Sequence, residues 1–200
     1  EDYDRFRELE SIFKQYGEQY GIDYLLGAAQ GYQESRLDQS VSSHAGAIGV
    51  MQVKKSTAAD PNVNVRDIHE VENNIHAGIK YLAWVRDRFE PDLAIADRMW
   101  FTLAAYNAGP GHVEDARRLA RQKGLNPNVW FGNVELVAAR RIGRETVRYV
   151  SNIAKYYVAY RLASRSFEIR EKVSENQLEE QEARQMIAVR SSVTLRSVDR

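Results

Sequence analysis

Apolar side chains recur at intervals of three and four residues in several stretches of the chain, which is the spacing of one face of an α-helix. The first stretch ends at Gly21, the second covers residues 24–36 with Asp23 as its N-cap, and the third covers residues 72–89, where Pro91 ends it. No stretch alternates strictly between apolar and polar positions, as a half-buried β-strand would. The pattern predicts a fold that is all-α or nearly so.

Three further helices are expected in the second half of the chain. Residues 98–108 form an apolar helix for which Asp97 can act as N-cap. The Gly-Pro-Gly sequence at residues 109–111 ends that helix and separates it from a polar helix over residues 112–123. A long amphipathic helix is predicted over residues 146–163, so the core is expected to be built from helices packed on helices.

Two regions depart from this periodic pattern. Residues 38–53 are rich in Ser, Gly and Ala, which indicates an ordered loop that faces the end of the helix over residues 24–36. Beyond residue 166 the chain is highly charged, and its one apolar cluster, residues 186–189, has no matching partner pattern. We therefore expect one domain over residues 1–166 and a charged tail over residues 167–200 whose order the pattern leaves open.

The charge balance and composition exclude several classes of function. Lys and Arg number 28, as do Asp and Glu, so no broad field favours nucleic acid or an anionic membrane as partner. No apolar stretch approaches the roughly 20 residues that span a bilayer, so no membrane contact by this chain itself is expected. Because the chain begins at Glu1 without a basic segment and an apolar run, we expect it to be a fragment that has lost a signal or a preceding domain.

Metal and thiol chemistry are not expected either. The chain has no cysteine, which excludes disulfides, thiolate catalysis and cysteine-ligated metals. Its four histidines do not have zinc-ligand spacing, and no twelve-residue calcium loop is present. The prediction is a protein without metal or cofactor.

One carboxylate, that of Glu34, lies in the last turn of the apolar helix predicted over residues 24–36. At the C-terminal end of a helix the macrodipole disfavours the ionised form, and burial would raise the pKa of Glu34 further. A carboxylic acid that stays protonated near neutral pH can donate a proton to a leaving group, as cleavage of a glycosidic bond requires. Taken alone, the feature fits a solvated glutamate at a helix end better than an active-site acid.

Several short motifs around Glu34 change this balance because they occur in one fixed order. They are Glu34-Ser35, SHAGAIGVMQ at residues 43–52, NIHAGIKYL at residues 74–82, AYNAG at residues 105–109 and ETVRYV at residues 145–150. Together they resemble the motifs of the lytic transglycosylase family, glycoside-cleaving enzymes of the goose-type lysozyme fold. An ordered set of this kind is far more specific than one short motif.

The resemblance spans residues 22–157, and it implies a lysozyme-like transglycosylase domain with a catalytic cleft between helices. Residues 99–101 and 114–117 look most like the membrane-bound murein transglycosylases of the F branch of that family. That branch implies a periplasmic location, lipid-anchored at the outer membrane, and an upstream regulatory domain resembling a solute-binding protein. Peptidoglycan glycan strands are the implied partner.

The resemblance also implies roles for individual residues. Glu34 is expected to act first as acid and then as base. The other six implied residues line the substrate cleft: Ser43 and Gln52 through polar contacts, Met51 as an apolar floor, and Tyr106, Asn107 and Tyr149, which complete it.

Several of these residues have a structural alternative. Tyr106 could be a core aromatic, Asn107 a C-terminal helix cap, and Ser43 a residue that bonds only to its own loop. Tyr149 is selected by its place after the Glu-Thr pair of its motif, since other tyrosines on the same helix fit packing roles. If its hydroxyl contacts Glu34, we expect it to help hold the neutral acid.

The number of carboxylates decides the expected mechanism. Ordinary glycosidases need two carboxyl groups, and Asp38 is the nearest second candidate. Because the helix is expected to have ended by Leu37, Asp38 is expected to anchor the loop. With Glu34 alone, the acetamido group of N-acetylmuramic acid would supply the missing nucleophile, and the C6 hydroxyl would close a 1,6-anhydro ring without consuming water.

The expected function is therefore a lytic transglycosylase that cleaves the MurNAc-β-1,4-GlcNAc bond of peptidoglycan and leaves 1,6-anhydroMurNAc ends. Two alternatives stay open. One is a goose-type lysozyme-like hydrolase that admits water, with Asp38 or another carboxylate as base. The other is a non-catalytic wall-binding or regulatory module that keeps the cleft.

Overall fold

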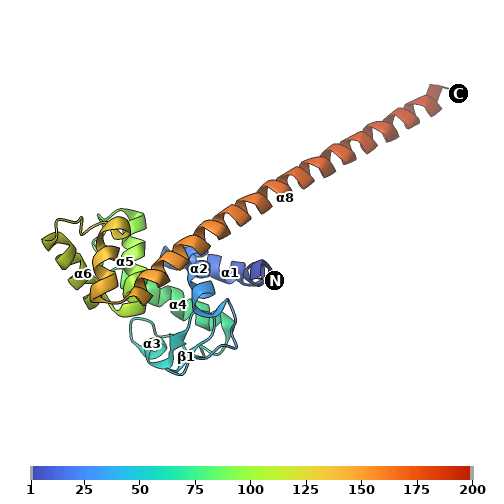
Figure 1. Cartoon of the computed structure of the whole chain (residues 1–200). Helices are drawn as coiled ribbons and strands as arrows, with labels where there is room; N and C mark the ends of the chain where they lie inside the picture. The colour runs from blue at the N-terminus through green and yellow to red at the C-terminus, as the bar shows by residue number, and fades with distance from the viewer. Residues whose placement is uncertain (1, 199–200) are drawn as a thin grey trace. The chain divides into compact units, whose positions relative to one another are not determined.

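Three helices, α1 (Asp2–Tyr20), α2 (Tyr24–Ser35) and α4 (Val71–Arg86), pack together in the first half of the chain in the computed structural model (Figure 1). The structure describes residues 2–198, and the side chains among them except those of residues 2, 182, 183 and 185–198. The chain divides into two compact units, residues 1–158 and residues 159–200. The predicted helices ending near Gly21 and over residues 24–36 are confirmed. The helix predicted over residues 72–89 is present as α4, but it ends at Arg86 with Asp87 as its C-cap, before Pro91 is reached.

The packing of α1, α2 and α4 follows from the apolar spacing in their sequences. The α1 side chains Phe6 and Phe13 have no solvent exposure. Asp23 begins α2 as predicted, since its carboxylate accepts a hydrogen bond from the backbone N–H of Leu25 at 2.9 Å. At Gly27 a Cβ atom would lie 2.6 Å from Cδ1 of Ile79, so the missing side chain lets α2 approach α4 closely. The helix that carries Glu34 is thus fixed on two sides.

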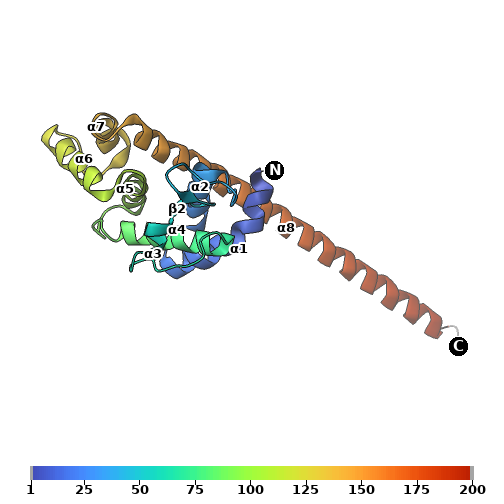
Figure 2. The same cartoon turned by 90° about the horizontal axis from the view of Figure 1, so that it is seen from below.

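The second half of the first unit contains α5 (Ile95–Ala108), α6 (Pro110–Gln122), the irregular turn η1 (Trp130–Val134) and α7 (Glu135–Arg141). Figure 2 shows α6 beside α5, with α7 close to the start of α8. The predicted helices over residues 98–108 and 112–123 are confirmed with earlier starts, whereas η1 and α7 were not predicted.

One capping prediction is wrong in this region. Helix α5 begins at Ile95 with Ala94 as its N-cap, so Asp97 lies inside the first turn. Its carboxylate instead accepts a hydrogen bond from the backbone N–H of Trp130 at 2.9 Å. The indole of Trp130 is fully buried and meets the ring of Phe101 edge to face at 5.9 Å. Asp97 therefore ties a distant turn to α5, which sequence spacing does not reveal.

The loop predicted over residues 38–53 contains two very short antiparallel strands, β1 (Ala47–Ile48) and β2 (Val53–Lys54), followed by the short helix α3 (Lys55–Ala59). Asn74 of α4, fully buried, accepts a hydrogen bond from the N–H of Met51 at 2.8 Å. Its Nδ2 donates to the carbonyls of Ile48 at 2.8 Å and Ile68 at 3.0 Å. One side chain thus holds the ordered loop against the helical core, and within residues 2–198 the fold is all-α apart from this small sheet.

Helix α8 (Arg144–Val198) begins in the first unit and continues through the second. It includes the helix predicted over residues 146–163 and continues as helix through the segment expected to be a charged tail. Side chains 168–181 are all exposed, and the apolar cluster at residues 186–189 lies outside the described side chains. Of the helices described, none has a stretch long and apolar enough to cross a membrane.

Candidate active site

Glu34 stands at the end of α2, where the chain turns into the loop. The helix ends at Ser35, and Arg36 and Leu37 both take left-handed backbone conformations, with φ of 56° and 61°. The Glu34 side chain is half-buried, and this loss of hydration raises the pKa of Glu34 to about 7. The predicted effect of burial is confirmed. Near neutral pH, Glu34 is protonated in a large fraction of the molecules.

Tyr149 of α8 meets Glu34 directly. Its hydroxyl donates a hydrogen bond to Oε1 of Glu34 at 2.6 Å. This bond lowers the pKa of Glu34 and works against burial, so the expectation that Tyr149 helps to hold the neutral acid has the wrong sign. Burial and the nearby charge of Glu34 raise the pKa of Tyr149 well above its usual value, so Tyr149 stays a neutral donor.

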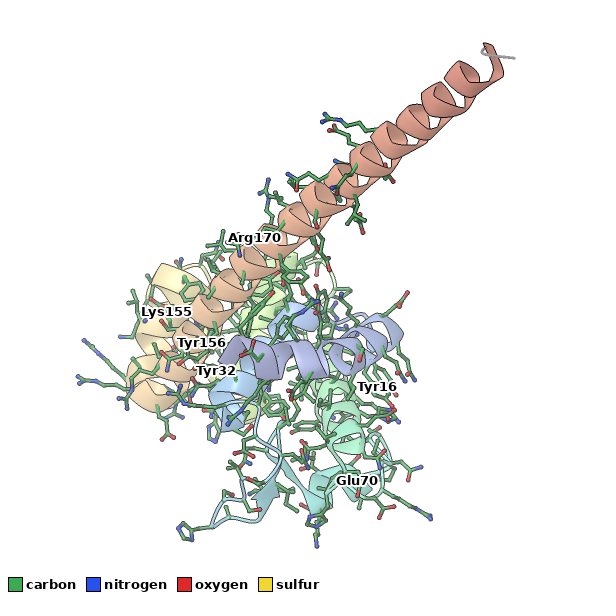
Figure 3. All side chains as sticks on the ribbon, turned by 90° about the vertical axis from the view of Figure 1, so that its right-hand side faces the viewer. Tyr16, Tyr32, Glu70, Lys155, Tyr156 and Arg170 are labelled. Carbon is green, nitrogen blue, oxygen red and sulfur yellow. The ribbon has the colours of Figure 1, made fainter. Side chains whose placement is uncertain are left out.

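Two further tyrosines of α8 contact α2 and the residue that caps its N-terminus. The rings of Tyr32 and Tyr156 meet edge to face with their centroids 4.7 Å apart (Figure 3). The hydroxyl of Tyr157 donates to the carboxylate of Asp23 at 2.6 Å. These contacts hold the Tyr149 and Glu34 backbones in a fixed relation, which a hydrogen bond as short as theirs requires.

A third residue of this cluster was not predicted. The fully buried Gln30 of α2 donates a hydrogen bond from Nε2 to the Tyr149 hydroxyl at 3.1 Å. Gln30 lies four residues before Glu34, so both side chains share one face of α2. Gln30 is a polar residue in the mostly apolar part of α2, one turn before Glu34, but this pattern does not reveal its contact with Tyr149.

Tyr106 and Met51 lie behind the acid. The Tyr106 hydroxyl donates to the carbonyl of Met51 at 3.0 Å. Burial and then the charge of Glu34 raise the pKa of Tyr106 well above its usual value, so Tyr106 stays a neutral donor. The Met51 side chain has no exposed surface. It therefore lies beneath the surface of the site in this structure, and Tyr106 fixes its backbone.

Two glycines make room for Met51. A Cβ at Gly78 of α4 would lie 2.5 Å from Cβ of Met51, so only a glycine fits there. A Cβ at Gly31 of α2 would lie 3.3 Å from Sδ of Met51 and 3.1 Å from both Leu37 and Val50. The loop is thus packed directly onto the helix face that bears Glu34.

The polar loop residues Ser43 and Gln52 are engaged mainly with their own loop. The Ser43 hydroxyl accepts a hydrogen bond from the N–H of Ala47 at 3.0 Å, and its side chain is exposed. Nε2 of Gln52 donates to the carbonyls of Gly49 at 2.9 Å and Val41 at 3.2 Å. The loop-stabilising alternative for Ser43 is therefore present, although the side chain is exposed to solvent.

Asn107 stands apart from this polar cluster, at the exposed end of α5. Its Oδ1 accepts a hydrogen bond from the hydroxyl of Thr146 in the first turn of α8 at 2.8 Å. A cavity of about 330 Å³ opens here, lined by Asn107, His112, Arg141, Glu145 and Thr146 among others. Tyr149 lies one helical turn beyond Thr146, so the cavity is about 5 Å along α8 from the residue that contacts Glu34.

Asp38, the nearest second carboxylate in sequence, has a structural role. Its Oδ1 accepts hydrogen bonds from the N–H of Ser40 at 2.8 Å and from the Ser40 hydroxyl at 2.7 Å. These bonds lower the pKa of Asp38, so it is an ionised turn anchor. Among the described residues, no group of three or more His, Asp or Glu side chains is arranged to hold a metal ion.

Sequence comparison relates this chain to a known protein family. Residues 11–129 match the family model described as Transglycosylase SLT domain. A membrane-bound lytic murein transglycosylase F from Pseudomonas fluorescens is 37% identical over 167 residues, which cover 76% of this chain and 34% of that protein. A protein of the same name from Desulfosudis oleivorans is 35% identical over 168 residues, which cover 78% of this chain and 37% of that protein.

The solved structures agree with the sequence comparison. The crystal structure of the 70 kDa soluble lytic transglycosylase from Escherichia coli superposes with a TM-score of 0.61 at 28% identity and covers 77% of this chain and 24% of the other. The chain spans about a third of the length of the curated relatives it matches. With the family model matching more than half of its residues, the chain belongs to the Transglycosylase SLT domain family.

Proposed function

We propose that this chain is the catalytic part of a lytic transglycosylase, which cleaves the MurNAc-β-1,4-GlcNAc bond of peptidoglycan without water and leaves 1,6-anhydroMurNAc ends. The observation that carries the proposal is the state of Glu34, a half-buried carboxyl group whose pKa burial raises to about 7. Such a group can give a proton and then accept one at the same pH. Relatives that carry the name lytic murein transglycosylase support the choice of substrate.

The first step uses Glu34 as acid. It protonates the oxygen that links MurNAc to GlcNAc, and the C1–O bond breaks as the acetamido carbonyl of MurNAc bonds to C1. General acid and base participation of this kind contributes about 10²- to 10⁴-fold in rate. When Glu34 loses its proton, Tyr149 stabilises the resulting carboxylate, because its hydroxyl already donates a hydrogen bond to Oε1.

The second step uses the same residue as base. The Glu34 carboxylate takes the proton from the C6 hydroxyl of MurNAc, O6 bonds to C1, and the acetamido carbonyl leaves C1. Atoms balance without water, and Glu34 returns to its protonated form. Asp38 supports this one-carboxylate route, since its two bonds from Ser40 keep it in the loop rather than in the role of a hydrolytic base.

The remaining predicted site residues are proposed to bind the glycan. The exposed side chains of Ser43 and Asn107 and the half-buried Gln52 offer polar contacts to sugar hydroxyl and acetamido groups. Tyr106 and Met51 support the site from below. The cavity beside Asn107 extends this surface along the start of α8 and would hold the strand next to the cleaved bond.

We further propose that the chain works in the cell envelope, in the periplasm at the outer membrane. Relatives named membrane-bound support an envelope location. An upstream anchor and a regulatory domain resembling a solute-binding protein fit the greater length of those relatives. Within this chain, residues 1–166 are proposed as the catalytic domain and residues 167–200 as an appended charged segment.

The test is digestion of purified sacculi followed by mass spectrometry of the muropeptides. The chain should release products with 1,6-anhydroMurNAc ends, and Glu34→Gln should reduce the rate by about 10²- to 10⁴-fold, because it can neither give nor accept the proton. Glu18→Gln, at an exposed site on α1, should keep full activity. Circular dichroism should show both variants folded.

Three results would overturn the proposal. Products heavier by one water would identify a lysozyme-like hydrolase instead. Binding to sacculi with no released product would identify a wall-binding or regulatory module. Full activity of Glu34→Gln would remove Glu34 from the chemistry altogether.

A further inference from the structure

We infer that Gln30 is a positioning residue of this site, which directs the hydroxyl proton of Tyr149 toward Oε1 of Glu34 and so reserves Oε2 for the proton that the substrate receives. The inference rests on the proposed function for its consequence, but its geometric basis is independent of it. Three side chains from two helices form one line of hydrogen bonds: Gln30 Nε2 to Tyr149 at 3.1 Å, and Tyr149 to Glu34 at 2.6 Å.

The direction of the line follows from its donors. The Nε2 atom of a glutamine amide donates hydrogen bonds and does not accept them. The oxygen of Tyr149 must therefore be the acceptor. A phenol has a single proton, and with Gln30 on one side that proton is left for Glu34. Glu34 Oε1 is therefore an acceptor in this structure, and the proton of the neutral acid resides on Oε2.

The orientation of the Gln30 amide is itself determined by its surroundings. The side chain is fully buried, and its Oε1 has no hydrogen-bond partner within the described part of the chain. The reversed amide would point Oε1 at Tyr149 and leave the NH₂ group, with its two donors, in that same unpartnered position. The donating orientation leaves one acceptor and one donor unpaired, whereas the reversed orientation leaves two donors unpaired. A buried acceptor without a partner is tolerated better than a second buried N–H without one, so the donating orientation is favoured.

The direction matters for catalysis. Without the Gln30 donor, the Tyr149 oxygen could accept a hydrogen bond from the protonated Glu34. The acidic proton would then point toward Tyr149 and away from the glycosidic oxygen of the substrate. Gln30 has no exposed surface, so it cannot touch substrate and can act only through Tyr149. Tyr149 itself remains a neutral donor, since burial holds its pKa well above the usual value.

The first experiment needs no substrate. The carboxyl carbon of Glu34 is titrated by NMR in the wild-type chain and in Gln30→Met, which keeps the side-chain length and removes the donor. Loss of the donor weakens the bond from Tyr149 to the carboxylate, so the pKa of Glu34 should rise by about half a unit. Leu26→Met, a buried change one turn earlier on α2, should leave the titration unmoved. An identical titration in Gln30→Met would overturn the inference.

The second experiment measures kinetics on glycan strands. Gln30→Met should lower kcat about tenfold with KM within a factor of two, because a misdirected proton slows the step without changing binding. In a Tyr149→Phe background the same change should have no further effect on kcat, since the line is already broken. An equal loss in both backgrounds, or a rise in KM alone, would overturn the inference. Failure of the proposed function would instead appear as wild-type protein without anhydro products, while the titration result stands.

Discussion

The two walls of the site use polar side chains in opposite ways. On the helix wall, made by α2 and α8, the polar groups of Gln30, Tyr149 and Glu34 bond to one another across two elements. On the loop wall, residues 38–54, the polar groups of Ser43 and Gln52 bond to backbone atoms of the loop itself. Residues of similar chemistry thus set a proton's position on one wall and the shape of the backbone on the other.

The contrast indicates that the helix wall supplies the acid and the loop wall supplies the shape of the site. The helix wall derives its reactivity from burial, which raises the pKa of Glu34 to about 7. The loop wall derives its position from a buried amide outside it, Asn74, which binds the backbone at Met51 and Ile48. Changes on the helix wall should therefore alter proton transfer, and changes on the loop wall should alter stability and binding.

The largest effect on stability is expected from removing the anchor of the loop wall. Asn74→Ala leaves the N–H of Met51 and the carbonyls of Ile48 and Ile68 without this partner, and we expect a loss of about 3 to 5 kcal/mol. Chemical denaturation measures the loss. Asn73 donates a long hydrogen bond of 3.4 Å to the carbonyl of Asp67, so Asn73→Ala should cost less than about 1 kcal/mol, and equal costs would contradict the anchoring role.

On the helix wall, the same burial that makes Glu34 an acid should cost stability at high pH. Its pKa is raised in the folded state, so its favourable contribution is fully present below about pH 4.5 and is lost as the pH rises through about 7. Glu34→Gln should remove this dependence and make the protein more stable than wild type at pH 8 by about 1 to 3 kcal/mol, the lower end allowing for partial solvent screening. Denaturation curves from pH 4 to pH 8 measure it; parallel curves would show that Glu34 is not desolvated.

A smaller change is expected when Tyr149 loses its hydroxyl. The bond from Tyr149 lowers the pKa of Glu34, so Tyr149→Phe should raise that pKa further above 7. The alkaline limb of the kcat/KM profile reports this group in the free enzyme and should move to higher pH, with kcat reduced about tenfold. A shift of that limb to lower pH would mean that the hydroxyl stabilises the neutral acid after all.

The smallest effect is expected at Ser43 on the loop wall. Ser43→Ala removes one bond from the N–H of Ala47 at an exposed position, and we expect a loss of about 0.5 to 1 kcal/mol. If Ser43 also contacts the glycan, KM should rise with kcat unchanged. Thermal melts and kinetics separate the two roles, and a fall in kcat alone would move Ser43 from the binding surface into the chemistry.

The sequence predicted the long helices well because their apolar spacing is a local property. The cap at Asp23 and the helix end near Glu34 are also local, and the structure confirms both. The role of Asp97 depends on Trp130, far along the chain, so a capping rule applied to neighbours alone assigned it wrongly. The short α3, η1 and α7 have too few residues to show a period.

The predictions for the site also succeeded where they rested on sequence motifs and failed where they depended on contacts between distant residues. Motif order identified Glu34, Tyr106 and Tyr149, and the structure brings these three together. It could not give the sign of the effect of Tyr149, which depends on which atom donates. Nor could it identify Gln30, because that role exists only through a contact with a residue 119 positions away.

The glycine at position 31 has a consequence for the spacing between the helix wall and the loop wall. Its missing Cβ would lie 3.1 to 3.3 Å from Leu37, Val50 and Met51, tighter than ordinary van der Waals contact. The loop wall therefore packs directly against the backbone of α2 at Gly31, where only the glycine hydrogen separates the two. Any side chain there would move the two walls apart by tenths of an ångström, a distance that matters to a proton that must reach one oxygen of a bound sugar.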